Sequence, residues 1–241
     1  MNILITGGSS GLGKAVTELL AANGHFVHFT FLPTPEYKEV VKQMTSTLKN
    51  IEAHPVDFCS KENVDIFCSK IQSMDLDVLV NNAYVGIPQT TYFHKIPVND
   101  FQTAFQYNLL PTISISQAVI NVFRNKKFGK IINIITESVM GLPPMGYSIY
   151  AANKAYLMEL SNVWNKEYTR YNITSNCILP SYMQTSFAKL DSRILEQMEK
   201  SHPLQKLLTV QEVADVINFL INTSQQLNGI KIPINAGQII L

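Results

Sequence analysis

A glycine-rich stretch near the start of the chain constrains the fold more than any other feature. Residues 6–13 read TGGSSGLG, directly follow the apolar run 2–6 and open an amphipathic segment, 12–22. Glycine permits a tight turn and close approach of the backbone to a ligand. A helix that begins at such a turn offers free N–H groups to a phosphate. The order strand, turn, helix therefore predicts a phosphate-binding βα unit.

The same alternation continues to the end of the chain. We expect strands at 2–6, 26–30, 51–56, 77–81, 130–135, 173–178 and 230–234, and helices at 12–22, 35–48, 61–73, 99–124, 150–169 and 210–221. Continuously apolar strands that alternate with helices are typical of a parallel sheet covered on both faces. The prediction is an α/β fold, a Rossmann-like doubly wound sheet of about seven mostly parallel strands with helices on both faces.

Size and charge limit the classes of protein. The 241 residues suit one domain, 1–241, and carry a net charge of +1. Nucleic acid and anionic membrane are poor main partners, because no basic run extends beyond Lys126-Lys127. Cys59, Cys68 and Cys177 form neither a CxxC pair nor a zinc spacing, so we expect free thiols and no metal site. The N-terminus lacks the pattern of a signal peptide, which favours a cytoplasmic location.

A tyrosine and a lysine at i and i+4 open a predicted helix in the second half of the chain. Tyr150 and Lys154 occur in YAANK, and this spacing puts both side chains on one helical face. An ammonium beside a phenol favours the phenolate, so we expect it to lower a tyrosine pKa that is about 10 in isolation. Such a tyrosine is suited to general acid catalysis at a carbonyl.

Together, the TGxxxGxG turn and the YxxxK pair resemble the classical short-chain dehydrogenase/reductase family, over nearly the whole chain. Asn108 in YNLL matches the catalytic-site asparagine of that family, and NNA at 81–83 resembles its NNAG. Tyr84 and Ser181 replace two family glycines, the second after Pro180. The resemblance implies that a dinucleotide contacts Gly7, Ser9, Ser10, Gly11, Leu12, Gly13, Asp57, Phe58, Asn82, Ala83, Tyr150, Lys154 and Pro180.

The resemblance also implies a serine at the end of the fifth strand that binds the substrate carbonyl. Counting from the strand start gives Thr136, and counting back from Tyr150 gives Glu137. The sequence VMG that follows favours Ser138. Only Thr136 and Ser138 carry hydroxyls that can donate to a carbonyl oxygen, and we favour Ser138 over Thr136. The expected catalytic set is Asn108, Ser138, Tyr150 and Lys154.

The end of the second expected strand bears on the choice of cofactor. Relatives that prefer NAD carry an aspartate there for the ribose hydroxyls, whereas residues 29–33 read FTFLP. NADP(H) is therefore favoured over NAD(H). Thr30, Lys14 and Lys38 are candidate contacts for the 2′-phosphate, and each is as readily interpreted as an ordinary surface residue.

The resemblance implies reduction of a ketone. Ser138 or Thr136 would bind the carbonyl oxygen and Tyr150 would give it a proton, while Lys154 holds the nicotinamide ribose and Asn108 a water. The stretch HPLQK at 202–206, followed by EVA at 212–214, is closest to 3-oxoacyl-[acyl-carrier-protein] reductases. A sugar or polyketide-like substrate is one alternative, and a catalytically silent dinucleotide-binding sensor or scaffold is another.

The resemblance and the composition also bear on partners. The substrate is expected to be a small or carrier-bound ketone covered by the segment 181–208, whose apolar residues are Met183, Phe187, Leu190, Ile194 and Met198. Lys126, Lys127 and Lys130 are candidates to meet an acidic carrier protein, although a solvated helix end is favoured. With only 15% charged residues, the chain is expected to form a homodimer or homotetramer through helices 99–124 and 150–169.

Overall fold

The computed structural model describes residues 1–88, 90–185 and 191–239. Within these ranges seven strands form one sheet in the order β3-β2-β1-β4-β5-β6-β7, and every neighbouring pair is parallel. The strands are β1 (Asn2–Ile5), β2 (Phe26–Phe31), β3 (Ile51–Pro55), β4 (Val78–Asn81), β5 (Gly129–Ile134), β6 (Ile173–Pro180) and β7 (Lys231–Ile234). The predicted doubly wound parallel sheet is confirmed.

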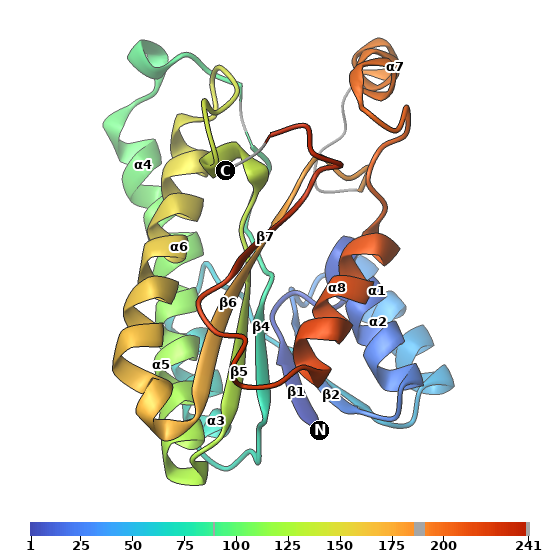
Figure 1. The fold of residues 1–241 in the computed structure, drawn as a ribbon. Helices are drawn as coiled ribbons and strands as arrows, with labels where there is room; N and C mark the ends of the chain where they lie inside the picture. Colours follow the sequence, from blue (N-terminus) through green and yellow to red (C-terminus); the bar gives the residue numbers. More distant parts are fainter. Residues whose placement is uncertain (89, 186–190, 240–241) are drawn as a thin grey trace.

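Helices cover both faces of the sheet, which Figure 1 shows nearly edge-on. One layer contains α1 (Gly11–Ala22), α2 (Pro35–Thr47) and α8 (Val210–Asn222), and the other contains α3 (Lys61–Ile71), α5 (Leu110–Lys126) and α6 (Ser148–Tyr168). Each layer closes its own apolar core, because alternate strand residues face opposite sides. Shorter helices are α4 (Val98–Ala104), α7 (Ser192–Ser201), η1 (Phe93–Lys95), η2 (Phe105–Leu109), η3 (Glu137–Val139) and η4 (Thr169–Tyr171).

The prediction of a single helix at 99–124 is wrong in one respect. The structure divides it into α4, the π-helical turn η2 and α5. Pro111 has no N–H to donate to the preceding turn, so the regular helical ladder cannot pass through it. The Thr112 hydroxyl instead donates to the Asn108 carbonyl at 2.7 Å. The interruption buries Asn108 inside the fold rather than leaving it on a straight helix.

All strands point the same way, so their carboxyl ends meet along the edge drawn at the top of Figure 1. The strand order reverses between β1 and β4, and a crevice for ligands forms at such a point. Of the segment 181–208, Met183 bridges to Leu208 and α7 projects from the same edge, whereas Phe187 and Leu190 lie outside the described residues. None of the described helices is both long and apolar enough to cross a membrane.

Candidate active site

The glycine turn joins β1 to α1 in a conformation that needs glycine. Gly7 and Gly11 have φ angles of +70° and +49°, in the left-handed region. A side chain at Gly13 is excluded, because its Cβ would lie 2.0 Å from the Gly7 carbonyl oxygen. The turn is therefore fixed tightly against the first residues of the helix, and its backbone is open to a ligand.

Polar groups from neighbouring strands hold this turn. The Gly7 N–H donates to the Thr30 hydroxyl at 2.9 Å, and the Asn82 amide donates to the carbonyls of Thr6 and Gly7 at 2.9 and 3.1 Å. The Ala83 N–H donates to the Thr6 hydroxyl at 3.0 Å. Thr30 is only 1% exposed, so it supports the turn and is not a contact for a 2′-phosphate. No local sequence pattern indicates this supporting role.

The start of α1 is suited to a pyrophosphate. Ser10 occupies the N-cap position, but its side chain makes no capping bond, and the first N–H groups of a helix have no acceptor within it. Ser9 and Leu12 are buried beneath the turn. A Cβ at Gly11 would lie 3.6 Å from Thr185 Cβ, so the segment after β6 passes over the same place.

Further candidate cofactor contacts lie at the carboxyl ends of β3 and β6. Asp57 follows β3 and accepts a bond from the Cys59 N–H at 2.8 Å, while Phe58 is buried in the core. After Pro180 the Ser181 N–H donates to the Ile234 carbonyl at 3.0 Å, which continues the β6–β7 pairing without a glycine turn. The Ser181 hydroxyl is buried and has no partner among the described residues. An extended phosphate-containing dinucleotide therefore fits the residues present.

Lys154 is buried in the first turns of α6. The residue is only 6% exposed. Its Nζ donates to the carbonyl of Ile134, at the end of β5, at 2.7 Å. Burial lowers the pKa of Lys154 to about 8. The ammonium lies 5.4 Å from the ring centre of Tyr84 and 5.9 Å from that of Tyr150. The predicted meeting of Tyr150 and Lys154 is thus present, with a second tyrosine added.

The pKa of Tyr150 differs from the expectation. Burial raises this pKa well above its usual value, and the neighbouring Tyr84 phenol adds to the effect. A hydrogen bond with the Thr136 side chain opposes both. The expected lowering by Lys154 is therefore not found, because desolvation outweighs an ammonium that is committed to Ile134 and lies over the ring faces.

The two candidate hydroxyls lie next to each other at the end of β5. Thr136 bonds with Tyr150, its hydroxyl donates to the Ser138 hydroxyl at 3.2 Å, and it accepts from the Ser138 N–H at 3.2 Å. Glu137 interacts instead with Asn235 and His202, and burial raises the pKa of Glu137. Thr136, Ser138 and Tyr150 thus form one connected polar group.

Tyr84 and Asn108 shape the loop after β4. The Tyr84 ring packs edge-on against Tyr150, with centres 5.2 Å apart, and burial raises the pKa of the Tyr84 phenol. The Asn108 side chain accepts from the Val85 N–H at 2.6 Å and donates to the Ala104 carbonyl at 3.1 Å. Gly86, two residues after Tyr84, has a φ of +84° and so turns the chain in the left-handed region. Tyr84 is therefore part of the site itself, which the sequence did not indicate.

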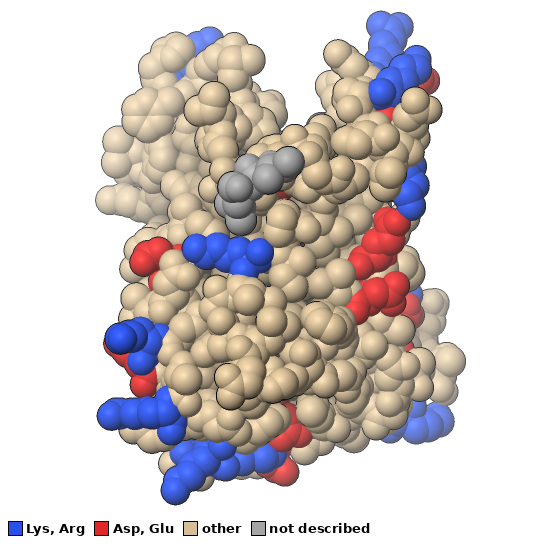
Figure 2. Space-filling view, viewed as in Figure 1, with Lys and Arg blue, Asp and Glu red and all other residues tan. Residues whose placement is uncertain are grey.

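A cavity of about 340 Å³ opens beside Tyr150. It lies between the loop after β4, α4 and the start of α6, and Tyr84, Asn108 and Tyr150 form part of its wall together with Val85, Ile87, Ile96, Ala104 and Ile149. Figure 2 shows a notch at this edge, between the projection that carries α4 and the one that carries α7, with largely uncharged walls. The phenol of Tyr150 thus borders a mainly apolar space.

Comparison with known proteins agrees with this geometry. The family model described as short chain dehydrogenase matches residues 1–194. A 3-oxoacyl-[acyl-carrier-protein] reductase FabG of Aquifex aeolicus is 28% identical over 97% of this chain and 95% of its own length. The solved structure "ElxO with NADP Bound" has a TM-score of 0.87 at 26% identity, covering 98% of this chain and 97% of that one.

A short-chain dehydrogenase from Burkholderia cenocepacia in complex with NADP has a TM-score of 0.84 at 25% identity, covering 98% of this chain and 96% of that one. The family match spans most of the chain, and the relatives align over nearly their full length. The chain therefore belongs to the short chain dehydrogenase family of oxidoreductases.

Proposed function

We propose that this protein is an NADPH-dependent reductase that converts a ketone, of the 3-oxoacyl thioester type, to a secondary alcohol. The observation that carries the proposal is the phenol of Tyr150, which borders the apolar cavity while it bonds with Thr136 and lies beside the Lys154 ammonium. A proton donor, a second hydroxyl and a cation thus converge at one wall of a cavity.

The residues have distinct roles in this proposal. NADPH supplies the hydride when it is bound. On substrate binding the Thr136 hydroxyl turns its one proton from Ser138 to the carbonyl oxygen, and Tyr150 gives that oxygen a proton as negative charge develops on it. A Tyr150 phenol of raised pKa stays protonated until the oxyanion forms. The Lys154 ammonium stabilises the Tyr150 phenolate that remains until a proton from solvent restores the phenol, and Asn108 fixes the loop that closes the cavity.

The proposal gives Thr136 the carbonyl-binding role ahead of Ser138, the reverse of the order that the sequence favoured. Its support is the closeness of the Thr136 side chain to the Tyr150 phenol, whose pKa it lowers. Ser138 accepts from Thr136 at 3.2 Å, and once the Thr136 proton turns to the substrate, the Ser138 hydroxyl donates to the Thr136 oxygen and orients it. Ser138 is then a positioning residue.

The preference for NADPH rests on the end of β2 and the start of α2. No acidic side chain follows β2 before Glu36, so nothing there repels a 2′-phosphate. Lys38 is exposed in the first turn of α2, whereas Lys14 is paired with Glu18 at 2.6 Å. The two solved relatives described above are complexes with NADP, which supports the same choice.

An acyl substrate is supported by apolar side chains around the site. Ile87, Phe93, Val98, Leu142 and Met145 are exposed large apolar residues in the loops and helices at this edge. In α7 no described residue is buried, so its apolar side is open for a ligand rather than used in a core. The matched FabG relatives, named for 3-oxoacyl carrier-protein substrates, favour the same class.

A carrier protein would not dock on the basic cluster suggested by the sequence. Lys130 is buried and its ammonium donates to the carbonyls of Leu220 and Ile221 at the end of α8. Lys126 is paired with Asp75 and Asp77. The end of α5 also lies at the opposite edge of the sheet from the cavity (Figure 1).

The test is NADPH oxidation against a panel of 3-oxoacyl thioesters, small ketones and keto sugars, with Tyr150→Phe as the matched variant. We expect turnover of the thioesters, a loss of about 10²–10⁴-fold in Tyr150→Phe and unchanged NADPH binding. Faster turnover of a keto sugar than of the thioesters would make a sugar, rather than a 3-oxoacyl thioester, the substrate class. Tight NADPH binding with no turnover of any ketone would support a silent sensor and overturn the proposal.

We also propose a homodimer or homotetramer in the cytoplasm. Tyr156 and Val163 of α6 and Leu110 of α5 are exposed apolar residues on the expected interface helices. Figure 2 shows mostly uncharged side chains over the middle of the face in view, with Lys, Arg, Asp and Glu gathered mainly along its left and lower margins. Light scattering of Val163→Glu tests this: a smaller assembly than wild type is expected, and an unchanged mass argues against this interface.

A further inference from the structure

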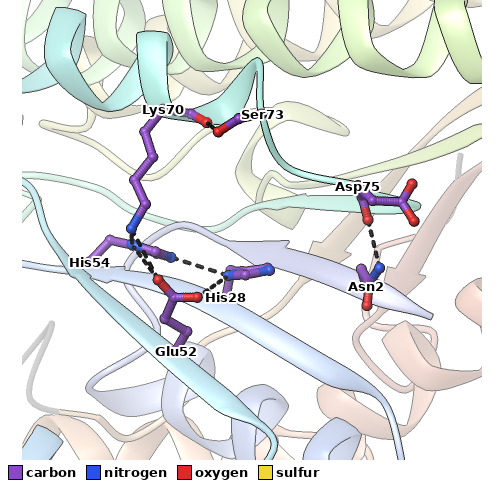
Figure 3. Close-up of polar contacts among 7 residues, drawn as sticks. All are labelled: Asn2, His28, Glu52, His54, Lys70, Ser73 and Asp75. Atoms are coloured by element: carbon purple, nitrogen blue, oxygen red, sulfur yellow. Dashed lines mark hydrogen bonds and ion pairs between the residues drawn. The ribbon is translucent and has the colours of Figure 1, made fainter.

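A second cluster of polar side chains lies between the sheet edge and α3, away from Tyr150. Figure 3 shows His28 on β2, Glu52 and His54 on β3, and Lys70 on α3. His28 is the register partner of Glu52, and His54 follows two residues later, so all three side chains share one face of the sheet. Phe67 of α3 packs on the His54 ring at 5.3 Å. The β2–β3 register therefore assembles the cluster.

We propose that His28, Glu52 and His54 bind a divalent transition-metal ion of the Zn²⁺ type. His28 Nδ1 lies 3.2 Å from His54 Nε2 and 3.4 Å from Glu52 Oε2, and one ligand atom from each residue lies within 4.8 Å of the others. Two ligands of a tetrahedral ion with bonds of about 2.0–2.1 Å are about 3.3–3.4 Å apart. Two separations already fit, and a rotation of Glu52 adjusts the third.

The donor set selects the class of ion. Two imidazoles with one carboxylate suit zinc, copper, nickel or cobalt, whereas magnesium and calcium prefer oxygen ligands alone. Imidazole must be neutral to bind a metal. Burial lowers the pKa of His54 to about 4 and also lowers the pKa of His28, while the bond from Lys70 lowers the pKa of Glu52.

Lys70 acts as a resident cation in this cluster. Its Nζ lies 3.0 Å from Glu52 Oε1 and 3.1 Å from His54 Nδ1 (Figure 3). An ammonium only donates, so His54 Nδ1 accepts and His54 Nε2–H donates to His28 Nδ1. In the structure, the proton between His54 and His28 and the Lys70 ammonium thus hold the three side chains together, as a metal ion would.

Metal binding rearranges this network without net loss of a proton. The His54 proton moves from Nε2 to Nδ1. In the structure, Nδ1 lies 3.8 Å from Glu52 Oε1. The Lys70 ammonium must withdraw, and its side chain is 51% exposed beside a Glu52 that is 45% exposed. The same opening admits the ion.

Replacing Lys70 is expected to change Zn²⁺ affinity in the opposite direction from replacing a ligand. His28→Gln and His54→Gln each remove a ligand, so Zn²⁺ affinity falls by about 10–100-fold or more. Lys70→Gln removes the competing cation, so affinity rises by about tenfold, because like charges a few ångströms apart repel each other. His94→Gln is the control, because His94 is exposed in η1, outside the cluster.

The experiment is calorimetric titration of the untagged chain with ZnCl₂, with the Tm of each variant measured alongside to verify folding. Wild type is expected to bind one ion per chain, and saturation at about 100-fold above Kd raises Tm by about 5–10 °C. Cobalt should give visible absorption bands in wild type and not in His54→Gln. Equal loss in His94→Gln, weaker binding in Lys70→Gln, or no heat from wild type and Lys70→Gln alike would overturn the site.

Discussion

Replacing Thr136 with valine tests the proposed chemistry most directly. The change keeps the size of the side chain and removes the hydroxyl that bonds with Tyr150 and with Ser138. Loss of one donor aimed at a developing oxyanion costs about 10²–10³-fold in kcat, or about 2.7–4 kcal/mol. We therefore expect Thr136→Val to lose activity by this amount.

Ser138→Ala is the matched comparison, because it is expected to lose much less activity than Thr136→Val. In the proposal Ser138 shares only a neutral hydrogen bond with Thr136, and loss of such a bond costs about 1 kcal/mol, or about fivefold in rate. Thr136→Ser restores the hydroxyl and is expected to keep most of the activity. The proposal thus predicts that Thr136→Val is at least tenfold worse than Ser138→Ala.

The structural effect of Thr136→Val is separable from the chemical one. Thr136 also caps η3 by accepting from the Ser138 N–H, and loss of a cap costs about 1 kcal/mol, or about 2–4 °C in Tm for a chain of this size. The assay is the rate of NADPH consumption with a 3-oxoacyl thioester, with NADPH binding measured separately by fluorescence. A 100-fold loss in Ser138→Ala beside a nearly active Thr136→Val would refute the assignment.

Three further changes test single features of the site. Lys154→Met should abolish turnover, yet the variant should unfold at a higher urea concentration than wild type at pH 7. The pKa of Lys154 is lowered to about 8, so the charged lysine destabilises the fold below about pH 8, by up to about 3 kcal/mol. This destabilisation disappears as the pH rises toward 10.5. An advantage that is as large at pH 10.5 would contradict this. Lys38→Ala should raise the KM for NADPH by about 2–5-fold without changing that for NADH, while Lys14→Ala changes neither; equal effects on both cofactors would remove Lys38 from the phosphate site. Tyr84→Phe removes a phenol that raises the pKa of Tyr150, so the basic limb of the rate–pH profile should move to lower pH; an unmoved limb would show that Tyr84 does not act on Tyr150.

Much of the fold followed from local sequence. Each expected strand is present, because an apolar run between helices has few alternatives to a buried parallel strand. The turn at Gly7, Gly11 and Gly13 was identifiable because only glycine tolerates those φ angles and that proximity. Where the expected helix at 99–124 was interrupted, the cause was Pro111, whose effect depends on how the neighbouring backbone regains its hydrogen bonds.

The sequence by itself determined the βα order, the phosphate-binding turn and the helical pairing of Tyr150 with Lys154, because these depend on residues close together in the chain. The tertiary structure decided the rest. It brought Thr136 to Tyr150, put Tyr84 over Lys154 and buried Lys130 under α8. It also assembled His28, Glu52 and His54 through the register of two strands. Desolvation and cross-strand distance are properties of the packed chain, and no local spacing encodes them.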